Sequence, residues 1–422
     1  MNQFSELPLS PVLHRNLAHN CFVTTTPVQA QAIPAALSGA DVMATAQTGT
    51  GKTLGFLLPI MNKLLSAPAV KDRPTMRKPI RALVLTPTRE LALQIADTFT
   101  KMAVNTDLRA AVVVGGLSEQ SQLRAIGAGA DIVIATPGRL EDFLSRQLIK
   151  LFSVETLVLD EADRMLDMGF LPPIERIIGA LPAKRQNLFF SATMEKDVER
   201  VISRHSDAAV RIAAGGSTMQ TPVQIDLHLY EVEKDMKLGL LRHMLKNESG
   251  SFLVFARTKH GTDRLARKLS GYGLRAAAMH GDRTQSQRNQ ALAGFREGRY
   301  RVLVATDVAA RGIHVDGVAH VVNYDLPQAP QDFVHRVGRT GRAGQRGCAW
   351  TFGSKSERSE ISRIERDCKV RLIRREVSPD VVSEHGEPYP VKEASQHESR
   401  AERKELPKSK ILFSSRRGGS YR

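Results

Sequence analysis

The segment Ala46–Thr53, with the sequence AQTGTGKT, has residue types that can bind phosphate groups. Glycine lets backbone N–H groups approach phosphate oxygens closely, and Lys52 adds a mobile positive charge. The Thr53 hydroxyl can ligate Mg²⁺. The general pattern has glycine at its first position, where this chain has Ala46. Because an apolar run precedes the segment and a helical pattern, Leu54–Leu65, follows it, we expect a phosphate-binding loop rather than a chance glycine-rich turn.

An acidic tetrapeptide, Asp160–Asp163, follows the apolar run Thr156–Leu159 directly. Its sequence is DEAD. At the carboxyl end of a parallel strand, Asp160 could organise Mg²⁺, and Glu161 could orient or deprotonate an attacking water. A solvated acidic turn is the alternative for an isolated tetrapeptide. The phosphate loop earlier in the chain favours the catalytic interpretation.

A basic motif, His335–Arg342, lies near the end of the chain and reads HRVGRTGR. Arg339 and Arg342 are three residues apart, so on a helical segment they would share a face. Arginine can stabilise charge on a transferring phosphoryl group, and the alternative is a basic contact to nucleic acid. We expect arginine fingers, because the first half of the chain supplies everything except a transition-state cation.

Short apolar runs alternate with helical patterns and must position these motifs. Continuous runs of this kind suit strands buried on both faces of a parallel sheet, with crossover helices such as Arg89–Met102 between them. In the first half, the runs are Asp41–Ala46, Arg81–Thr86, Ala111–Val114, Asp131–Ala135, Thr156–Leu159 and Asn187–Phe190. In the second half, they are Phe252–Phe255, Arg275–Met279, Arg301–Ala305, His320–Asn323 and Ala349–Phe352. The pattern predicts two doubly wound α/β domains.

The segment between the two series and the end of the chain differ in composition from the rest. Ala213–Pro222, AAGGSTMQTP, is small and flexible in composition and indicates a linker. Residues from about Ser383 to Arg422 have few large apolar side chains and end in a Lys- and Arg-rich stretch. Such a segment buries too little apolar area to offset its chain entropy, so we expect a disordered basic tail.

The overall charge favours a polyanionic partner. The 422 residues include 60 Lys and Arg against 44 Asp and Glu, a net charge of +16. No stretch approaches the ~20 apolar residues of a spanning helix, and Met1–Arg15 has no secretory pattern. Cys21, Cys348 and Cys368 lack disulfide or metal-ligand spacing. We therefore expect nucleic acid rather than a membrane as the partner, and a cytoplasmic location. On charge alone, the alternative is a soluble protein that is merely basic.

Together, the motifs resemble the DEAD-box RNA helicases of superfamily 2, and the organisation is similar to the bacterial RhlE-type branch. The resemblance extends from about Phe4 to Val377, with the motifs in the family's order. It implies an α/β protein of two tandem RecA-like domains, each a mostly parallel sheet flanked by helices, followed by the disordered basic tail. The implied divisions are a Q-motif region (1–29), an ATP-binding domain (30–212), a linker (213–222), a C-terminal helicase domain (223–382) and the tail (383–422).

The resemblance also implies roles for individual residues toward ATP and Mg²⁺. Gln29 of the Q motif would read the adenine edge, although taken alone it would be an ordinary residue at a helix N-terminus. The nucleotide-binding residues implied are Phe4, Phe22, Thr24, Gln29, Ala46, Gln47, Thr48, Gly49, Thr50, Gly51, Lys52, Thr53, Gly312 and His314. The catalytic residues implied are Lys52, Asp160, Glu161, His335, Arg339 and Arg342, and the metal ligands are Thr53 and Asp160. The family usually has Asp where this chain has His314.

A further set of residues resembles the family's RNA-contacting and coupling motifs. The implied RNA contacts are Pro87, Thr88, Arg89, Gly115, Gly116, Thr136, Pro137, Gly138, Arg139, Gly281, Gln285, Arg288, Thr306 and Asp307. Some of them serve equally as turns and helix caps. Ser191, Thr193 and Asp163 are implied to couple hydrolysis to strand separation, through hydroxyls that bond back to the acidic loop.

The resemblance predicts an ATP-dependent RNA helicase that closes on ATP and RNA and reopens after hydrolysis. RNA would be held by its backbone with little sequence specificity. A non-unwinding ATP-gated RNA clamp would use the same residues. A DNA motor is disfavoured by the DEAD and Q motifs, and a plain NTPase by the duplicated domain and basic charge. The partners implied are RNA and, within the family's range, ribosomal precursors or the RNA degradation machinery, with a monomeric core.

Overall fold

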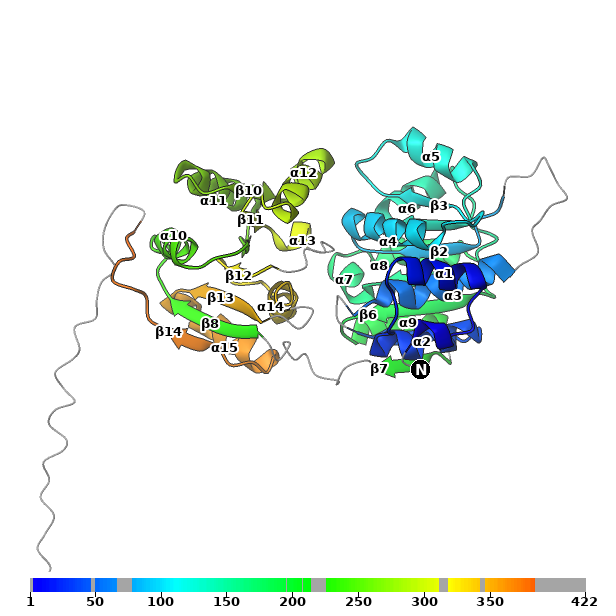
Figure 1. Cartoon of the computed structure of the whole chain (residues 1–422), viewed down its shortest axis with the longest axis horizontal. Helices are drawn as coiled ribbons and strands as arrows, with labels where there is room; N and C mark the ends of the chain where they lie inside the picture. Colours follow the sequence, from blue (N-terminus) through cyan, green and yellow to red (C-terminus); the bar gives the residue numbers. More distant parts are fainter. Residues whose placement is uncertain are drawn as a thin grey trace, which may run out of the picture.

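The computed structural model describes residues 3–46, 50–66, 78–194, 196–206, 208–213, 225–310, 318–341 and 346–383. It contains two α/β domains that lie side by side (Figure 1). The expected tail lies outside the described residues except for Ser383, and so do the expected linker residues after Ala213.

The first domain is built on a seven-stranded parallel sheet in the order β3-β4-β2-β5-β6-β1-β7. Its strands are β1 (Val42–Thr45), β2 (Ala82–Leu85), β3 (Ala110–Val113), β4 (Ile132–Ala135), β5 (Thr156–Asp160), β6 (Gln186–Ser191) and β7 (Val210–Ala213). Its helices are η1 (Phe4–Glu6), α1 (Pro11–His19), α2 (Pro27–Leu37), α3 (Lys52–Ser66), α4 (Arg89–Met102), α5 (Glu119–Gly127), α6 (Pro137–Ser145), α7 (Ala162–Asp167), α8 (Leu171–Gly179) and α9 (Lys196–His205).

The second domain is built on another seven-stranded parallel sheet, in the order β10-β11-β9-β12-β13-β8-β14. Its strands are β8 (Ile225–Glu231), β9 (Phe252–Phe255), β10 (Ala276–Met279), β11 (Val302–Ala305), β12 (His320–Asn323), β13 (Gly347–Gly353) and β14 (Ile373–Arg375). Its helices are α10 (Lys237–Asn247), α11 (Lys259–Gly271), α12 (Gln285–Arg296), α13 (Asp307–Ala310), α14 (Pro330–Val337), η2 (Lys355–Glu357) and α15 (Arg358–Asp367).

Both faces of each sheet are buried, as the apolar runs predict. In β4, Ile132 and Ile134 join the core under α1, α2, α3 and α4, whereas Val133 and Ala135 join the core under α6, α7, α8 and α9. The second sheet is likewise covered on both faces, by α10 and α11 on one side and by α12, α14 and α15 on the other. This sandwiching of a parallel sheet between helices confirms the expected fold class.

Two sequence expectations differ from the structure. Strands β7, β8 and β14 have no counterpart among the predicted runs, and β7 includes Ala213, the first residue of the expected linker. Helix α14 ends at Val337, so Arg339 lies in the turn after the helix and not on a helical face, while Arg342 lies outside the described residues. Gly338 is the C-cap, with φ −66° and ψ 6°, and glycine has a low intrinsic helix propensity.

Candidate active site and nucleic-acid interface

Three of the chemical motifs of the first domain meet at one edge of its sheet. The phosphate loop follows β1, the acidic tetrapeptide begins at the last residue of β5, and Ser191 is the last residue of β6. Strands β5, β6 and β1 are neighbours and run parallel. Their carboxyl ends therefore open on the same crevice, the usual ligand position in an open α/β sheet.

The phosphate loop is held by contacts to its own backbone and to the segment around Gln29. Lys52 is buried as the first residue of α3, and its Nζ donates to the Ala46 carbonyl at 3.0 Å. The Gln29 Nε2 donates to the Gly51 carbonyl at 2.9 Å. A Cβ on Gly51 would overlap that amide, and its φ of 82° also favours glycine. Gln47, Thr48 and Gly49 lie outside the described residues.

Gln29 also has the helix N-terminal role that the sequence alone suggests. Its Oε1 accepts from the Thr26 backbone N–H at 2.8 Å, and the Thr26 hydroxyl accepts from the Gln29 N–H, which completes a capping box at α2. Phe4 is buried and meets Phe22 edge-on, with ring centroids 6.5 Å apart. Thr24 forms a β-bridge with Gln3. The structure thus gathers the Q-motif aromatics beside one another, with Phe22 left 37% exposed.

The acidic loop has two carboxylates that are both buried away from solvent. Asp160 is 2% exposed, and desolvation, opposed by the charge of Lys52, raises its pKa to about 7. Glu161 is also buried and adopts a left-handed backbone with φ 53°. Such a conformation is uncommon for a non-glycine residue and is found at active sites. Arg164 Nε lies 3.7 Å from Glu161 Oε2.

Asp163 connects the acidic loop to the end of β6. Its Oδ2 accepts from the Ala192 and Thr193 backbone N–H groups at 3.1 and 2.9 Å and from the Thr193 hydroxyl at 3.1 Å. The Asp163 N–H donates to the Ser191 Oγ at 3.3 Å. The hydrogen bonds that the family resemblance implied between these segments are therefore present.

The second domain contributes a cluster of basic side chains around a small pocket. Its lining is Arg164 of the first domain together with Phe255, Asp307, Ala310, Asp332, His335, Arg336 and Arg339 of the second. Arg339 is buried and His335 half-buried. Arg164 belongs to α7, which begins within the acidic tetrapeptide at Ala162, so the structure brings His335 and Arg339 close to that loop across the two domains.

Arg336 is a functional-site residue that sequence reasoning missed. It is 2% exposed and pairs with both carboxylate oxygens of Asp307 at 2.6 and 2.7 Å, while it also donates to Asn323 Oδ1 and the Asp325 carbonyl. Asp307, predicted from resemblance as an RNA contact, is thus engaged in fixing α14. The sequence feature that could have revealed Arg336 is its position among the apolar residues of a helix, because an arginine buried there needs a charged or polar partner.

The predicted RNA contacts of the first domain lie at the ends of β2, β3 and β4. Pro87 and Thr88 precede α4, and the Thr88 hydroxyl caps it by accepting from Leu91 N–H. Arg89 packs against the two glycines that follow β3, because a Cβ on Gly116 would overlap its guanidinium. Thr136, Pro137, Gly138 and Arg139 begin α6. The pKa of Arg89 is lowered by burial and by the charges of Arg288 and Arg139.

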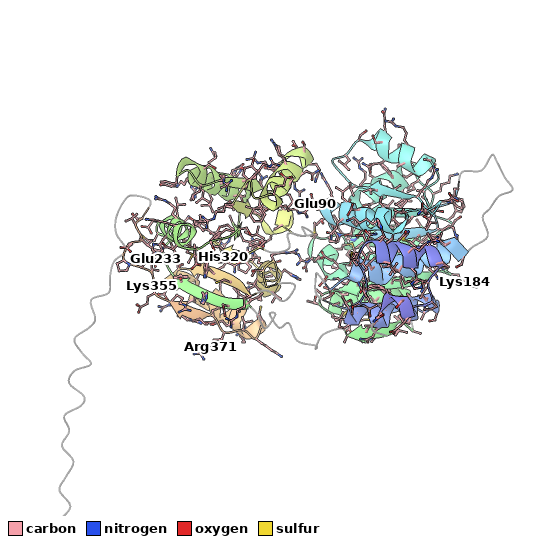
Figure 2. All side chains as sticks on the ribbon, in the orientation of Figure 1. Glu90, Lys184, Glu233, His320, Lys355 and Arg371 are labelled. Atoms are coloured by element: carbon pink, nitrogen blue, oxygen red, sulfur yellow. The ribbon has the colours of Figure 1, made fainter. Side chains whose placement is uncertain are left out.

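The two domains meet through a polar contact on this same surface. The Glu90 carboxylate accepts from Gln285 Nε2 at 2.9 Å and pairs with Arg288 Nη2 at 3.0 Å. Figure 2 labels Glu90 where the first domain faces the second. Gln285 is buried in the first turn of α12, which Thr284 caps. The contact joins a predicted RNA motif of each domain. Arg89, Arg139 and Arg288 lie close enough for their charges to interact and make up a basic surface across the junction, in which Arg288 is paired with Glu90.

The remaining predicted residues of the second domain fall into two groups. Gly281 is exposed after β10, and Thr306 is half-buried after β11. Gly312 and His314 lie outside the described residues.

In the described part of the chain, no three His, Cys, Asp or Glu side chains are arranged to hold a metal ion. Nor does any described helix combine the length and apolar composition needed to cross a membrane.

Most of the chain matches known helicase sequences. Residues 26–201 match the DEAD/DEAH box helicase family, and residues 236–344 match the conserved C-terminal helicase domain. The ATP-dependent RNA helicase CshA of Listeria monocytogenes is 42% identical over 374 residues, covering 88% of this chain and 70% of the relative. The CshA protein of Streptococcus pneumoniae strain TIGR4 is 44% identical over 372 residues, covering 88% and 69%.

Solved structures of helicases are similar in fold. S. cerevisiae Dbp5 bound to RNA and ADP BeF3 superposes with a TM-score of 0.77 at 30% identity, covering 89% of this chain and 96% of that one. Mss116p bound to single-stranded RNA and AMP-PNP gives a TM-score of 0.80 at 28% identity, covering 88% and 78%.

Proposed function

Because this chain belongs to the DEAD/DEAH box helicase family and is an ATP-dependent RNA helicase with two tandem RecA-like domains, we propose specific roles for its residues in ATP hydrolysis and RNA binding. The observation that carries the proposal is the pocket where Arg164 of α7 meets His335 and Arg339 of the other domain. This pocket supports a composite site, in which the first domain contributes the phosphate loop and the acidic loop and the second domain contributes the cations.

The first domain binds the triphosphate and activates water. Lys52 exchanges its contact with the Ala46 carbonyl for the phosphates, and the backbone of residues 46–53 cradles them. Glu161 orients the attacking water. Phe22 and Gln29 contact the adenine, with Phe4 and Thr24 supporting Phe22. This division is supported by exposure, because Phe22 is 37% exposed whereas Phe4 is buried.

A Mg²⁺ ion fits the residues at the end of β5. Asp160 is a buried carboxylate whose desolvation a bound cation would offset, and Thr53 lies in the first turn of the helix that begins at the phosphate loop. These two side chains would hold the ion, together with phosphate oxygens. When bound, Mg²⁺ neutralises charge on the phosphates.

The second domain supplies the cations that complete the site. Arg339 and Arg342 stabilise the charge that develops on the transferring phosphoryl group, and His335 links that group to the domain junction. Arg336 acts through the others, because its pairing with Asp307 fixes the helix that carries His335 and precedes Arg339. Gly312 and His314 approach the ribose side of the nucleotide.

RNA binding and hydrolysis are coupled through two contacts: that of Glu90 with Arg288 between the domains, and that of Asp163 with the end of β6. Arg89, Arg139 and Arg288 hold phosphates on the surface that crosses the junction, and the neighbouring glycine, threonine and proline loops bring the backbone close. The RNA contacts proposed on the second domain are Gly281, Gln285, Arg288, Thr306 and Asp307. Asp163 transmits changes in the acidic loop to Ser191 and Thr193. RNA is read through its backbone, with little sequence preference.

The enzyme is proposed to act in the cytoplasm as a monomer, on RNA in ribosomal precursors or degradation complexes. Free thiols at Cys21, Cys348 and Cys368 suit a reducing compartment. The RhlE-type branch assignment stays a prediction, since the relatives compared above are CshA proteins. Crosslinking the protein to RNA in cells and sequencing the bound RNA tests the substrate class.

A steady-state experiment tests the central proposal. ATPase activity is measured with single-stranded RNA, with DNA of the same sequence and without nucleic acid, and release of a strand from a short RNA duplex is followed in parallel. We expect stimulation by RNA but not by DNA, together with ATP-dependent duplex release. Stimulation without strand release would instead identify an ATP-gated RNA clamp, and equal stimulation by DNA would contradict the assignment of the RNA surface.

A further inference from the structure

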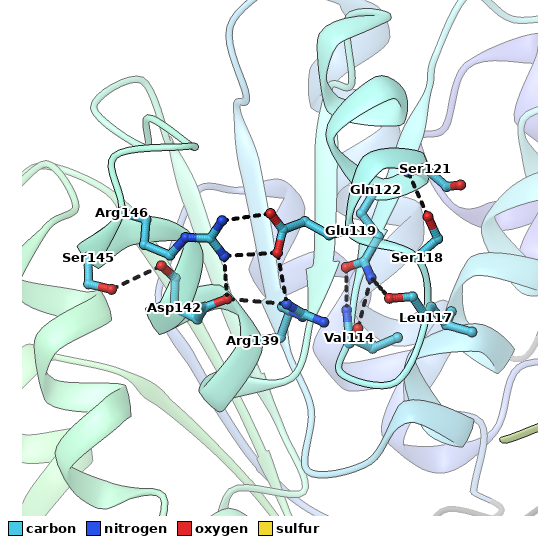
Figure 3. Close-up of polar contacts among 10 residues, drawn as sticks. All are labelled: Val114, Leu117, Ser118, Glu119, Ser121, Gln122, Arg139, Asp142, Ser145 and Arg146. Carbon is cyan, nitrogen blue, oxygen red and sulfur yellow. Dashed lines mark hydrogen bonds and ion pairs between the residues drawn. The ribbon is translucent and has the colours of Figure 1, made fainter. Parts of the chain in front are cut away.

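Four charged side chains form a closed network beside the predicted RNA surface of the first domain (Figure 3). Glu119 is the first residue of α5, and Arg139, Asp142 and Arg146 belong to α6 or its C-cap. Glu119 Oε1 and Oε2 accept from Arg146 Nη2 and Nη1 at 2.7 and 2.8 Å. Glu119 Oε2 and Asp142 Oδ2 also accept from Arg139 Nη1 at 3.3 and 3.2 Å. The network ties α5 to α6.

Arg139 uses only one of its three nitrogens in this network. Its Nε and Nη2 form no hydrogen bond with any described residue, and its guanidinium carbon lies 5.4 Å from the centre of the Phe143 ring. In Figure 3 the end of Arg139 away from Asp142 points toward the loop that contains Val114 and Leu117. Gly115 and Gly116 are in that loop, and Arg89 packs against them. The free edge of Arg139 therefore faces the basic surface.

Arg146 keeps the Glu119 carboxylate charged and oriented. Its two hydrogen bonds are the largest cause that lowers the pKa of Glu119, and the same pairing raises the pKa of Arg146. A bidentate pair of this kind fixes the plane of the carboxylate as well as its position. Glu119 can then present Oε2 to Arg139 at a constant place, although α5 and α6 are separate elements and Arg139 is a long, flexible side chain.

We propose that Glu119 is a positioning residue for RNA binding: it anchors one nitrogen of Arg139 so that the opposite edge of the guanidinium is presented to an RNA phosphate beside Gly115 and Gly116. This inference rests on the role of Arg139 as an RNA contact, proposed above. Glu119 does not touch RNA itself. It links the loop after β3 to the loop after β4, so that two predicted RNA motifs keep a fixed spacing.

Electrostatics alone makes the opposite prediction, which gives the proposal a sharp test. Glu119 is an anion close to a polyanion-binding surface, so its neutralisation should tighten RNA binding if charge is all that matters. If Glu119 positions Arg139, its neutralisation should weaken RNA binding, because the guanidinium loses its anchor. The direction of the change in affinity therefore separates the two roles.

The experiment uses the full chain with Glu119→Gln, which keeps the size of the side chain. The dissociation constant for a fluorescent single-stranded RNA is measured with a non-hydrolysable ATP analogue, and ATPase activity is measured against RNA concentration. We expect the dissociation constant and the half-saturating RNA concentration to rise roughly three- to tenfold, as for loss of a coupled charged contact. The kcat at saturating RNA should stay unchanged. Tighter or unaltered RNA binding would overturn the proposal.

Two further variants provide the controls. Glu141→Gln removes an equal charge, this time from α6. Glu141 pairs with Arg176 and has no hydrogen bond or ion pair with Arg139, whose partners are Glu119 and Asp142; the RNA affinity of this variant should be equal to wild type or slightly higher. Arg139→Ala should weaken RNA binding more than Glu119→Gln, and adding Glu119→Gln to it should weaken binding no further. If Arg139→Ala leaves RNA affinity unchanged, Arg139 is not an RNA contact. If Arg139→Ala weakens RNA binding but Glu119→Gln leaves it unchanged, Glu119 does not position Arg139.

Discussion

The two domains share one strand order but differ in what they place at the strand ends. Matched by position, β3-β4-β2-β5-β6-β1-β7 of the first domain corresponds to β10-β11-β9-β12-β13-β8-β14 of the second. The loops after β2, β3 and β4 have predicted RNA contacts, and the loops after β10 and β11 do as well. Thr88 after β2 and Thr258 after β9 even cap their helices in the same way. The half of the sheet with the predicted RNA contacts is therefore duplicated.

The other half of the sheet is not duplicated. In the first domain, the ends of β1, β5 and β6 hold the phosphate loop, the acidic loop and Ser191. In the second, β8 is followed by Val232–Met236, which has no glycine, and β12 ends at Asn323, which bonds Thr351 and Arg336. The same edge thus has the predicted nucleotide-binding motifs in one domain and fixes a helix in the other. Residues at the strand ends therefore give the two domains different roles on the same fold.

The largest expected effect tests whether the second domain contributes to chemistry at all. Arg339→Ala, and separately Arg342→Ala, should lower kcat for ATP roughly 10³–10⁵-fold, the range of an arginine finger, with little change in ATP affinity. Arg366→Ala, a 75% exposed arginine of the same domain, is the control. If KM rises while kcat is unchanged, the arginine is a contact for ATP binding, and the second domain does not contribute to chemistry through it.

The next effect tests the catalytic role of the first domain. Glu161→Gln keeps Asp160 and the phosphate loop but removes the carboxylate that orients water, so ATP turnover should fall roughly 10²–10⁴-fold. Binding of ATP and RNA, measured by fluorescence, should persist and give a long-lived closed complex. Glu175→Gln, on an exposed surface pair with Arg204, should behave as wild type. ATPase activity near the wild-type level would contradict the assignment.

A stability measurement tests the scaffold interpretation of the second domain. Arg336→Ala leaves the Asp307 carboxylate without its bidentate partner, and breaking a fully buried pair costs about 3–5 kcal/mol, an upper bound here because the Asp307 side chain is 20% exposed. The denaturant midpoint of the transition that reports on the second domain should fall, as followed by Trp350, the single tryptophan of the chain. Arg358→Ala, whose 64% exposed side chain pairs with Glu231, should change the free energy of unfolding by less than about 1 kcal/mol. Equal effects would show that Arg336 is no scaffold.

A smaller effect is expected from the basic tail. Deletion of residues 384–422 should leave kcat with saturating RNA intact, raise the RNA concentration required and flatten the dependence of binding on salt, because fewer counterions are released from RNA. The deletion begins after Ser383 because that residue is buried against the second domain. An unchanged salt slope would mean that the tail does not contact RNA.

The smallest effect concerns His314, at the position where the family resemblance implies Asp. We expect this chain to discriminate ATP from its deoxyribose analogues less sharply than the His314→Asp variant, because a neutral imidazole offers a single acceptor nitrogen to the sugar hydroxyls. Measurements at several pH values with saturating RNA would also detect the charge of the imidazole near the phosphates. Identical discrimination and pH profiles in both proteins would show that His314 does not touch the sugar, and Asp316 would then be the residue to test.

Sequence alone was sufficient where local patterns are strong. Helix Arg89–Met102 and strands Phe252–Phe255 and His320–Asn323 have the predicted bounds, because long periodicity and continuous apolar runs leave few alternatives. Strands β7 and β14 escaped prediction because they lie at sheet edges, and β8 because only alternate residues are buried. The end of α14 could have been read from Gly338, which stops the helix before Arg339.

The residue types that are predicted to perform the chemistry were set by the sequence: a phosphate loop, paired carboxylates, arginines and duplicated strand-end loops. Which of them touch was decided by the tertiary structure. Glu90 meets Arg288, Gln29 meets Gly51, and Glu119 meets Arg146 across separations that no local pattern spans. The physical reason is that a parallel sheet brings distant strand ends to one edge, and only the packing of the helices fixes which charged side chains can pair there.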